Sequence, residues 1–215
     1  MKTIGSTIIM LALASSLFAD NGKELKLASP DGTHEIVFYQ KQVSPAVNEL
    51  CYRVDYKSQP VVNESRAGLE LDNRIWEMAL GVRNLKQPAC WMDNLEVDSV
   101  TYQPETNLTW QPLYGERSSV RDHYRTGTLY LSKKDNSGYR LNIEVRAYNE
   151  GVAFRYFFPE HPKAIFHKVV GDLTEYALPA GTKAWTEQWA QAFFECLNID
   201  DIKHPVERAL TFELP

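Results

Sequence analysis

The chain has 215 residues, of which 44% are hydrophobic and 12% aromatic, a composition typical of a globular domain with a sizeable core. Its formal net charge is −5 at pH 7, and no run of basic residues interrupts this negative balance. A net negative chain without a basic patch is a poor match for a polyanion, so nucleic acid and anionic membrane surfaces are excluded as partners.

The first 19 residues have the pattern of a secretory signal peptide. Lys2 supplies the charged end, residues 8–14 (Ile-Ile-Met-Leu-Ala-Leu-Ala) the apolar stretch, and Ala19 the small residue at the cleavage point. The apolar stretch is shorter than the roughly 20 residues needed to cross a bilayer, and no later segment approaches that length. We therefore expect a cleaved signal at 1–19, a periplasmic or secreted protein without a membrane partner, and a mature domain over 20–215.

The first half of the mature chain predicts antiparallel strands with one buried face. Residues 25–39 contain two alternating strands around a Ser-Pro-Asp-Gly turn, which indicates a hairpin. Further strands are expected at 50–56 and 68–72, where apolar and polar residues alternate. Between residues 73 and 100 the alternation weakens, and we expect a loop with strand fragments there.

The second half continues in the same way. Residues 126–132 and 139–148 predict a hairpin, and residues 152–158 pair back after another turn. Strands follow at 169–176 and near Trp185. No long stretch keeps a helical period, and turn signals recur about every 8 to 12 residues. We therefore expect an all-β fold, an antiparallel β-sandwich or barrel.

The stretch at residues 110–124 combines aromatic rings with charged groups, and Pro112 and Gly115 break any regular element within it. Aromatic rings beside planar charged groups are typical of carbohydrate sites. The candidate sugar-binding side chains are Trp110, Tyr114, Glu116, Arg117, Arg121 and His123. The alternative is a structural loop whose Arg and Glu side chains pair with each other under aromatic cover, and residue types alone do not separate the two.

The remaining polar residues indicate neither a metal centre nor a catalytic nucleophile. Cys51, Cys90 and Cys196 are widely spaced, which fits either one disulfide with a free thiol or three buried thiols. No second histidine lies at a ligand-like spacing from His123, which favours a structural histidine over a metal ligand or general base. No phosphate loop or catalytic-triad motif is present, so we assign no catalytic residue.

Four longer motifs follow one another along essentially the whole mature chain. They are residues 27–32 (LASPDG), 68–71 (GLEL), 110–116 (WQPLYGE) with 121–124 (RDHY), and 147–159 (AYNEGVAFRYFFP). The last two are long and contain rare residues at fixed spacing. Together they resemble the N-terminal domain of glycoside hydrolase family 97, a group of exported bacterial α-glucosidases and α-galactosidases.

The resemblance implies a β-sandwich of the large, galactose-mutarotase-like kind, packed in full-length members against a (β/α)8 barrel that carries both catalytic carboxylates. Such a barrel takes about 250 residues, so we expect this chain to be the N-terminal domain, truncated at its C-terminal end and inactive alone. The expected function is an accessory, carbohydrate-facing domain that contributes to the active-site rim for an α-glucoside or α-galactoside. The alternative is a stand-alone periplasmic module that binds carbohydrate or protein.

The resemblance also implies a calcium ligand. Alignment without gaps from residues 184–185 puts Glu195 on the glutamate that similar members contribute from this domain to an active-site calcium ion. Residues 186–189 (TEQW) depart from the family pattern, which makes Glu187 a substitute candidate. Calcium takes about six to eight oxygen ligands, so Glu195 alone cannot form the site, and an ordinary strand carboxylate is the alternative.

Overall fold

The computed structural model describes residues 24–45, 47–72, 93–133, 138–161 and 167–215, and within them nearly every regular element is a β-strand. The strands are β1 (Glu24–Ala28), β2 (His34–Ser44), β3 (Val47–Tyr56), β4 (Gln59–Arg66), β5 (Leu69–Leu71), β6 (Leu95–Trp110), β7 (Val120–Lys133), β8 (Arg140–Tyr148), β9 (Gly151–Phe157), β10 (Val169–Asp172), β11 (Lys183–Thr186), β12 (Glu195–Asn198) and β13 (Thr211–Glu213). A short 3-10 turn at Ile199–Asp201 is the helical element of these residues. No helix among them is long and apolar enough to cross a membrane.

The first sheet is a meander of four antiparallel strands in the order β1-β2-β3-β4. The expected hairpin at 25–39 is confirmed, with Leu27 opposite Ile36 and the chain turning at Gly32. Gly32 has φ 75°, a conformation that glycine adopts without steric cost. Asp31 fixes this turn by accepting hydrogen bonds from Ser29 and Thr33, which lower the pKa of its carboxyl to about 2.

The second sheet is also an antiparallel meander, in the order β6-β7-β8-β9. The expected strands at 126–132, 139–148 and 152–158 are confirmed within it. Strand β6 was not expected, although its first residues fall in the predicted loop with strand fragments. Its pairing with β7 shifts twice, once between Val97 and Ser99 and again between Gln103 and Thr106. These shifts break the two-residue alternation on which strand prediction depends.

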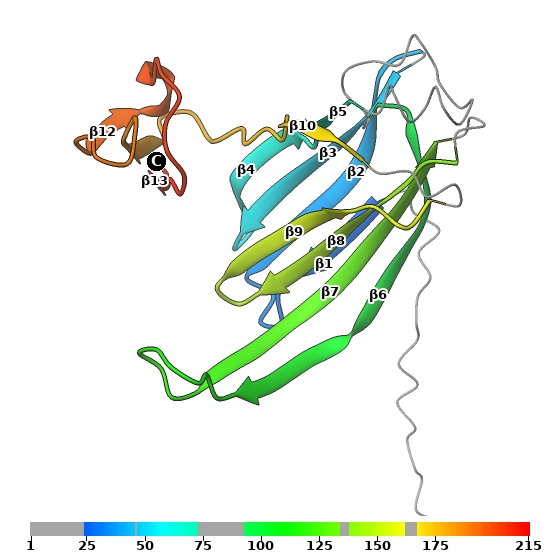
Figure 1. The fold of residues 1–215 in the computed structure, drawn as a ribbon, viewed down its shortest axis with the longest axis horizontal. Coiled ribbons are helices and arrows are strands. Elements are labelled where there is room, and N and C mark those ends of the chain that lie inside the picture. Colours follow the sequence, from blue (N-terminus) through cyan, green and yellow to red (C-terminus); the bar gives the residue numbers. More distant parts are fainter. Residues whose placement is uncertain (1–23, 46, 73–92, 134–137, 162–166) are drawn as a thin grey trace, which may run out of the picture.

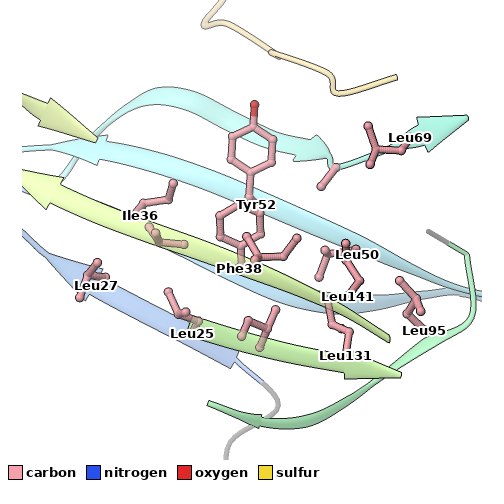
Figure 2. Close-up of a cluster of buried hydrophobic side chains, with 14 of the residues drawn as sticks. Leu25, Leu27, Ile36, Phe38, Leu50, Tyr52, Leu69, Leu95, Leu131 and Leu141 are labelled. Atoms are coloured by element: carbon pink, nitrogen blue, oxygen red, sulfur yellow. The ribbon is translucent and has the colours of Figure 1, made fainter. Parts of the chain in front are cut away.

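The two sheets face each other and enclose one apolar core (Figures 1 and 2). The ring of Phe38 on β2 lies 5.3 Å from the ring of Tyr52 on β3 and 5.1 Å from that of Phe154 on β9. Leucines from both sheets, including Leu50 on β3 and Leu141 on β8, pack in the same core cluster. The expected all-β antiparallel sandwich is therefore confirmed.

The edge of the first sheet is extended by the segment that follows β9. Strand β10 pairs with β5, and the chain then runs along β4. Leu173 N donates to Gly68 O, Glu175 N to Arg66 O, and Asn63 N to Ala177 O. The segment 173–177 therefore lies along the first sheet like an additional edge strand.

The last residues form a separate small sheet in the order β12-β11-β13. Figure 1 shows this sheet standing apart from the sandwich, at the end of an extended connection. Thr182, Ala184 and Thr186 are its buried side chains, so its own core is minimal. Cys196 is exposed on β12 and Cys51 is buried in the sandwich, and both are free thiols, whereas Cys90 and residues 1–19 lie outside the described residues.

We expect Phe38→Ala to lower the free energy of unfolding by about 3–5 kcal/mol, because it removes a fully buried ring that contacts both sheets. Phe157→Ala is the matched control, since that ring is 42% exposed on β9 and its loss should cost about 1 kcal/mol or less. Urea unfolding followed by circular dichroism measures both, and equal losses would contradict this description of the core.

A C-terminal pocket and an exposed hairpin tip as the candidate functional site

A pocket of about 480 Å³ opens in the C-terminal unit. Its walls come from the ends of β11 and β12, the connection between them, and the chain after the 3-10 turn. The connection between the strands returns on itself through the hydrogen bond from Ala192 N to Trp189 O. The bond from Glu207 N to Glu187 O holds the later chain against it. The β11–β12 connection and the chain after the 3-10 turn thus form the walls of a concave surface on this small sheet.

The pocket brings together Glu195 and Glu187, the two carboxylates considered as calcium ligands. Glu195 begins β12 opposite Thr186, and Glu187 directly follows Thr186. Antiparallel pairing therefore brings the two glutamates to the same end of the sheet, where both line the pocket. Asp201, Lys203 and His204 line the same pocket. The result is a concavity of mixed character that holds more carboxylates than cations.

Aromatic side chains dominate the rest of this unit and are largely uncovered. Trp189 and Phe193 line the pocket and are 59% and 94% exposed. Trp185, Phe194 and Phe212 are also exposed. Monomeric proteins rarely expose contiguous apolar patches of this kind unless the patch meets a partner or ligand. The exposed rings of this unit therefore mark a candidate contact surface.

The donors of the pocket do not complete a calcium shell. Among the described residues, no group of three or more His, Cys, Asp or Glu side chains is arranged to hold a metal ion. Calcium takes about six to eight oxygens. Calcium binding by Glu195, or by Glu187, therefore remains a prediction.

The tip of the β6–β7 hairpin carries most of the predicted sugar-binding residues. Trp110 ends β6 and is 53% exposed, and Tyr114 in the following loop is 89% exposed. Neither Glu116 nor Arg117 has a hydrogen bond or ion pair within the described part of the chain. The alternative of a loop closed by Arg–Glu pairs under aromatic cover therefore does not match the structure. Figure 1 shows this hairpin extending beyond β8 and β9.

Arg121 and His123 lie further from the tip of the same hairpin. They belong to a polar cluster whose other members were not predicted from the sequence. His123 Nε2 is 2.6 Å from Glu105 Oε1, and Arg125 Nε donates to Glu105 Oε2 at 2.9 Å. Arg125 also donates to Pro30 O in the β1–β2 turn, which ties the hairpin to the first sheet. Arg121 Nε donates to Asn107 Oδ1. His123 and Arg125 lower the pKa of the Glu105 carboxyl.

The structure does not bring all the predicted site residues together. The hairpin tip and the C-terminal sheet lie well apart in Figure 1. Glu195 therefore cannot share one compact site with Trp110 and Tyr114 in this chain. Glu105 was missed because its alignment with His123 depends on the second register shift of β6. One sequence pattern does indicate a polar cluster there: Arg121, His123 and Arg125 alternate along the chain and so share one face of β7.

We expect His123→Phe to raise the pKa of Glu105 toward the ordinary glutamate value, because the hydrogen bond from His123 is the largest cause of its lowering. Since the folded-state pKa is depressed, the stability that this carboxylate contributes is present above its unfolded pKa and is lost as pH falls through the folded pKa. Carboxyl NMR titration measures the shift. Arg121→Gln, which touches Asn107 and not Glu105, is the control, and an unchanged pKa in His123→Phe would contradict the geometry.

The chain is similar in sequence and in fold to known proteins. Residues 27–214 match the family model described as Glycosyl-hydrolase 97 N-terminal. A retaining alpha-galactosidase of Bacteroides thetaiotaomicron is 26% identical over 178 residues, which cover 83% of this chain and 22% of that protein.

Among solved structures, a Glycoside Hydrolase Family 97 enzyme from Pseudoalteromonas sp. strain K8, in complexes with panose and with acarbose, superposes with a TM-score of 0.72 at 24% identity. The superposition covers 88% of this chain and 27% of that enzyme. A beta-arabinopyranosidase superposes with a TM-score of 0.59 at 17% identity, over 75% of this chain and 22% of its own. The chain thus spans about a quarter of the length of these relatives. Because the family model matches nearly all of the described residues, the chain belongs to the N-terminal domain family of glycoside hydrolase family 97.

Proposed function

We propose that the chain is the accessory, carbohydrate-facing domain of an α-glucosidase- or α-galactosidase-type glycoside hydrolase. In this proposal it adds a rim and one calcium ligand to an active site that a (β/α)8 domain completes. The name of the Bacteroides relative and the sugar complexes of the Pseudoalteromonas enzyme support the choice of substrate class. The signal-like residues 1–19 support a periplasmic or secreted location.

The observation that carries the proposal is the C-terminal pocket, where Glu187 and Glu195 lie beside exposed Trp189 and Phe193. Exposed rings around a polar hollow fit an interface whose apolar rim is covered by another domain. The carboxylates then lie at the covered end of the hollow, where they can meet oxygen ligands from that domain. Such an interface would typically bury roughly 600–1,500 Å².

The role of calcium in this proposal follows from the donors. Glu195, with Glu187 as the alternative, would hold one side of the ion, and the remaining oxygens would come from the other domain and water. When bound, the ion would supply fixed positive charge near the sugar. The contribution of this chain is to orient the glutamate, which β12 does by pairing with β11 from Glu195 to Asn198.

The catalytic step itself is assigned to no residue of this chain. Glycoside hydrolysis needs two carboxyl groups held on either side of the scissile bond, with one of them protonated. Glu187 is half-buried and Glu195 is exposed, and the proposal assigns neither of them to proton transfer. The choice between glucoside and galactoside therefore depends on residues outside this chain.

A second candidate is a stand-alone periplasmic module that binds glycan or protein through the hairpin tip. The observation that favours it is the exposure of Trp110 and Tyr114, beside Glu116 and Arg117, whose side chains have no partner among the residues that the structure describes. Rings that protrude on a rigid two-stranded arm can stack on a sugar without another domain. Binding of panose to the isolated chain, lost in Trp110→Ala, would favour this candidate over the first.

We expect the isolated chain to show no turnover of aryl α-glucosides or α-galactosides, with or without calcium. The physical reason is that the acid and base carboxylates and the scaffold that positions them are missing. Release of nitrophenol measures this directly. Activity that co-purifies with the chain and survives Glu187→Gln and Glu195→Gln would contradict the accessory role.

We also expect weak calcium binding by the isolated chain, because Glu195 and Glu187 leave most of the coordination shell to water. Calorimetric titration measures it for the wild type, for Glu195→Gln, and for Glu213→Gln as a control on β13 outside the pocket. A dissociation constant in the micromolar range or below, lost in Glu195→Gln and kept in Glu213→Gln, would mean that the chain holds a complete site.

A further inference from the structure

We propose that His167, together with His161, forms an acid-sensitive contact that holds β10, and the chain leading from it to the C-terminal unit, against the sandwich. Mild acid releases this chain while the core of the sandwich stays folded. The inference goes beyond the proposed function, because it needs neither calcium nor sugar and concerns the sandwich rather than the C-terminal pocket.

The first observation is a cluster of rings around Tyr139, a residue of the core that is only 1% exposed. The ring of His161 lies 5.6 Å from the Tyr139 ring, and the ring of His167 lies 5.7 Å from it. His167 also lies 4.3 Å from the ring of Phe158, with 30° between the two planes. Two imidazole rings therefore pack directly on a side chain of the core.

The second observation is the place of His167 in the chain. Tyr139 directly precedes β8 of the second sheet, whereas His167 comes just before β10, which pairs with β5 beside the first sheet. From β10 the chain continues through the segment 173–177, which lies along the first sheet, and then enters the C-terminal unit. The contact of His167 with Tyr139 therefore joins the two sheets at the point where this run of chain begins.

Backbone bonds across this contact show what its loss would free. Asp72 N donates to Lys168 O, Leu173 N to Gly68 O, and Glu175 N to Arg66 O. Each of these bonds joins the chain after His167 to the edge of the first sheet. The exchange of the three donor amides therefore reports whether that chain is held or released.

The surroundings of His167 favour a neutral imidazole. Burial, and after it the charge of nearby His161, lowers the pKa of the His167 side chain from its ordinary value of 6.5 to about 4. Other charged groups around β10 include Lys168, whose Nζ lies 3.9 Å from Asp72 Oδ2, and Glu70 on β5. Protonation of His167 would place a cation against Phe158 and a core tyrosine, so a protonated ring is more stable in water.

The direction of the pH effect follows from these two environments. A released His167 titrates near the ordinary value of 6.5, and a packed one near 4. Between these values the released form binds one more proton, so it gains population as the pH falls, whereas above 6.5 this group has no effect. Each pH unit changes the ratio about tenfold, which gives about thirtyfold between pH 6.5 and pH 5. Ordinary carboxylates remain mostly charged down to pH 5, so the ion pairs persist over this range.

The experiment measures hydrogen exchange of the mature chain from pH 7.5 to pH 5, with each rate divided by the intrinsic rate of that amide at the same pH. We expect the protection of Asp72, Leu173 and Glu175 to be constant above pH 6.5 and to fall about thirtyfold between pH 6.5 and pH 5. Amides in β2 and β3 should keep their protection, because the core does not open.

His167→Phe keeps an aromatic ring against Phe158 and Tyr139 but cannot take up a proton. The three amides should therefore keep their protection at pH 7.5 and lose its dependence on pH. His34→Phe is the matched control, since His34 is another half-buried histidine, stacked 4.7 Å from Tyr56 on the first sheet, and its loss should leave the dependence unchanged.

Every other outcome overturns the proposal. Constant protection down to pH 5 would mean that no release occurs, and an equal fall in the wild type and in His167→Phe would assign the pH effect to another group. If His167→Phe does not fold, as judged by circular dichroism, NMR titration of the His167 ring in the wild type decides. A pKa near 4 supports the proposal, and a value of 6.5 or above, as expected if the neighbouring rings attract the imidazolium, contradicts it.

Discussion

The contact of Phe38 with Tyr52 and Phe154 is the interaction on which the rest of the structure depends. It joins β2 and β3 of the first sheet to β9 of the second, and the leucine core forms around it. Burial also raises the pKa of Tyr52, whose hydroxyl donates to Glu175 O and so holds the segment that extends the first sheet. One aromatic group therefore fixes the distance between the sheets, the placing of β9 and the course of the chain toward the C-terminal unit.

The features with functional interest all lie where this core ends. The hairpin of β6 and β7 continues beyond the first sheet, to which Arg125 ties it through Pro30 and Tyr102 through Lys26. The C-terminal sheet has three small buried side chains and a surface of exposed rings. A cleft opens between β4 and β9, beside Phe154. A well-packed core with three exposed margins supports the proposed accessory role, because domains meet their neighbours through such surfaces.

Much of the fold could be predicted from the sequence, because strands β1 to β3, β5 and β7 to β9 keep a clear alternation between turns. Strand β6 could not, since two register shifts move its apolar residues from one face to the other. The candidate site was likewise predictable only in part. The exposed rings of Trp110 and Tyr114 followed from the proline and glycine around them, whereas the Glu105–His123 contact depends on the shifted register. Glu187 and Glu195 line one pocket because β11 pairs with β12, which spacing alone does not reveal.

The central claim is that the exposed margin around Glu195 faces a catalytic domain. The most direct test is hydrogen exchange of the mature chain with and without the separately produced remainder of the retaining alpha-galactosidase of Bacteroides thetaiotaomicron. The claim predicts slower exchange in residues 186–206, and unchanged exchange on the outward face of β8. No change at 186–206, or protection confined to the hairpin tip at 110–120, would contradict it and favour a module that acts without that domain.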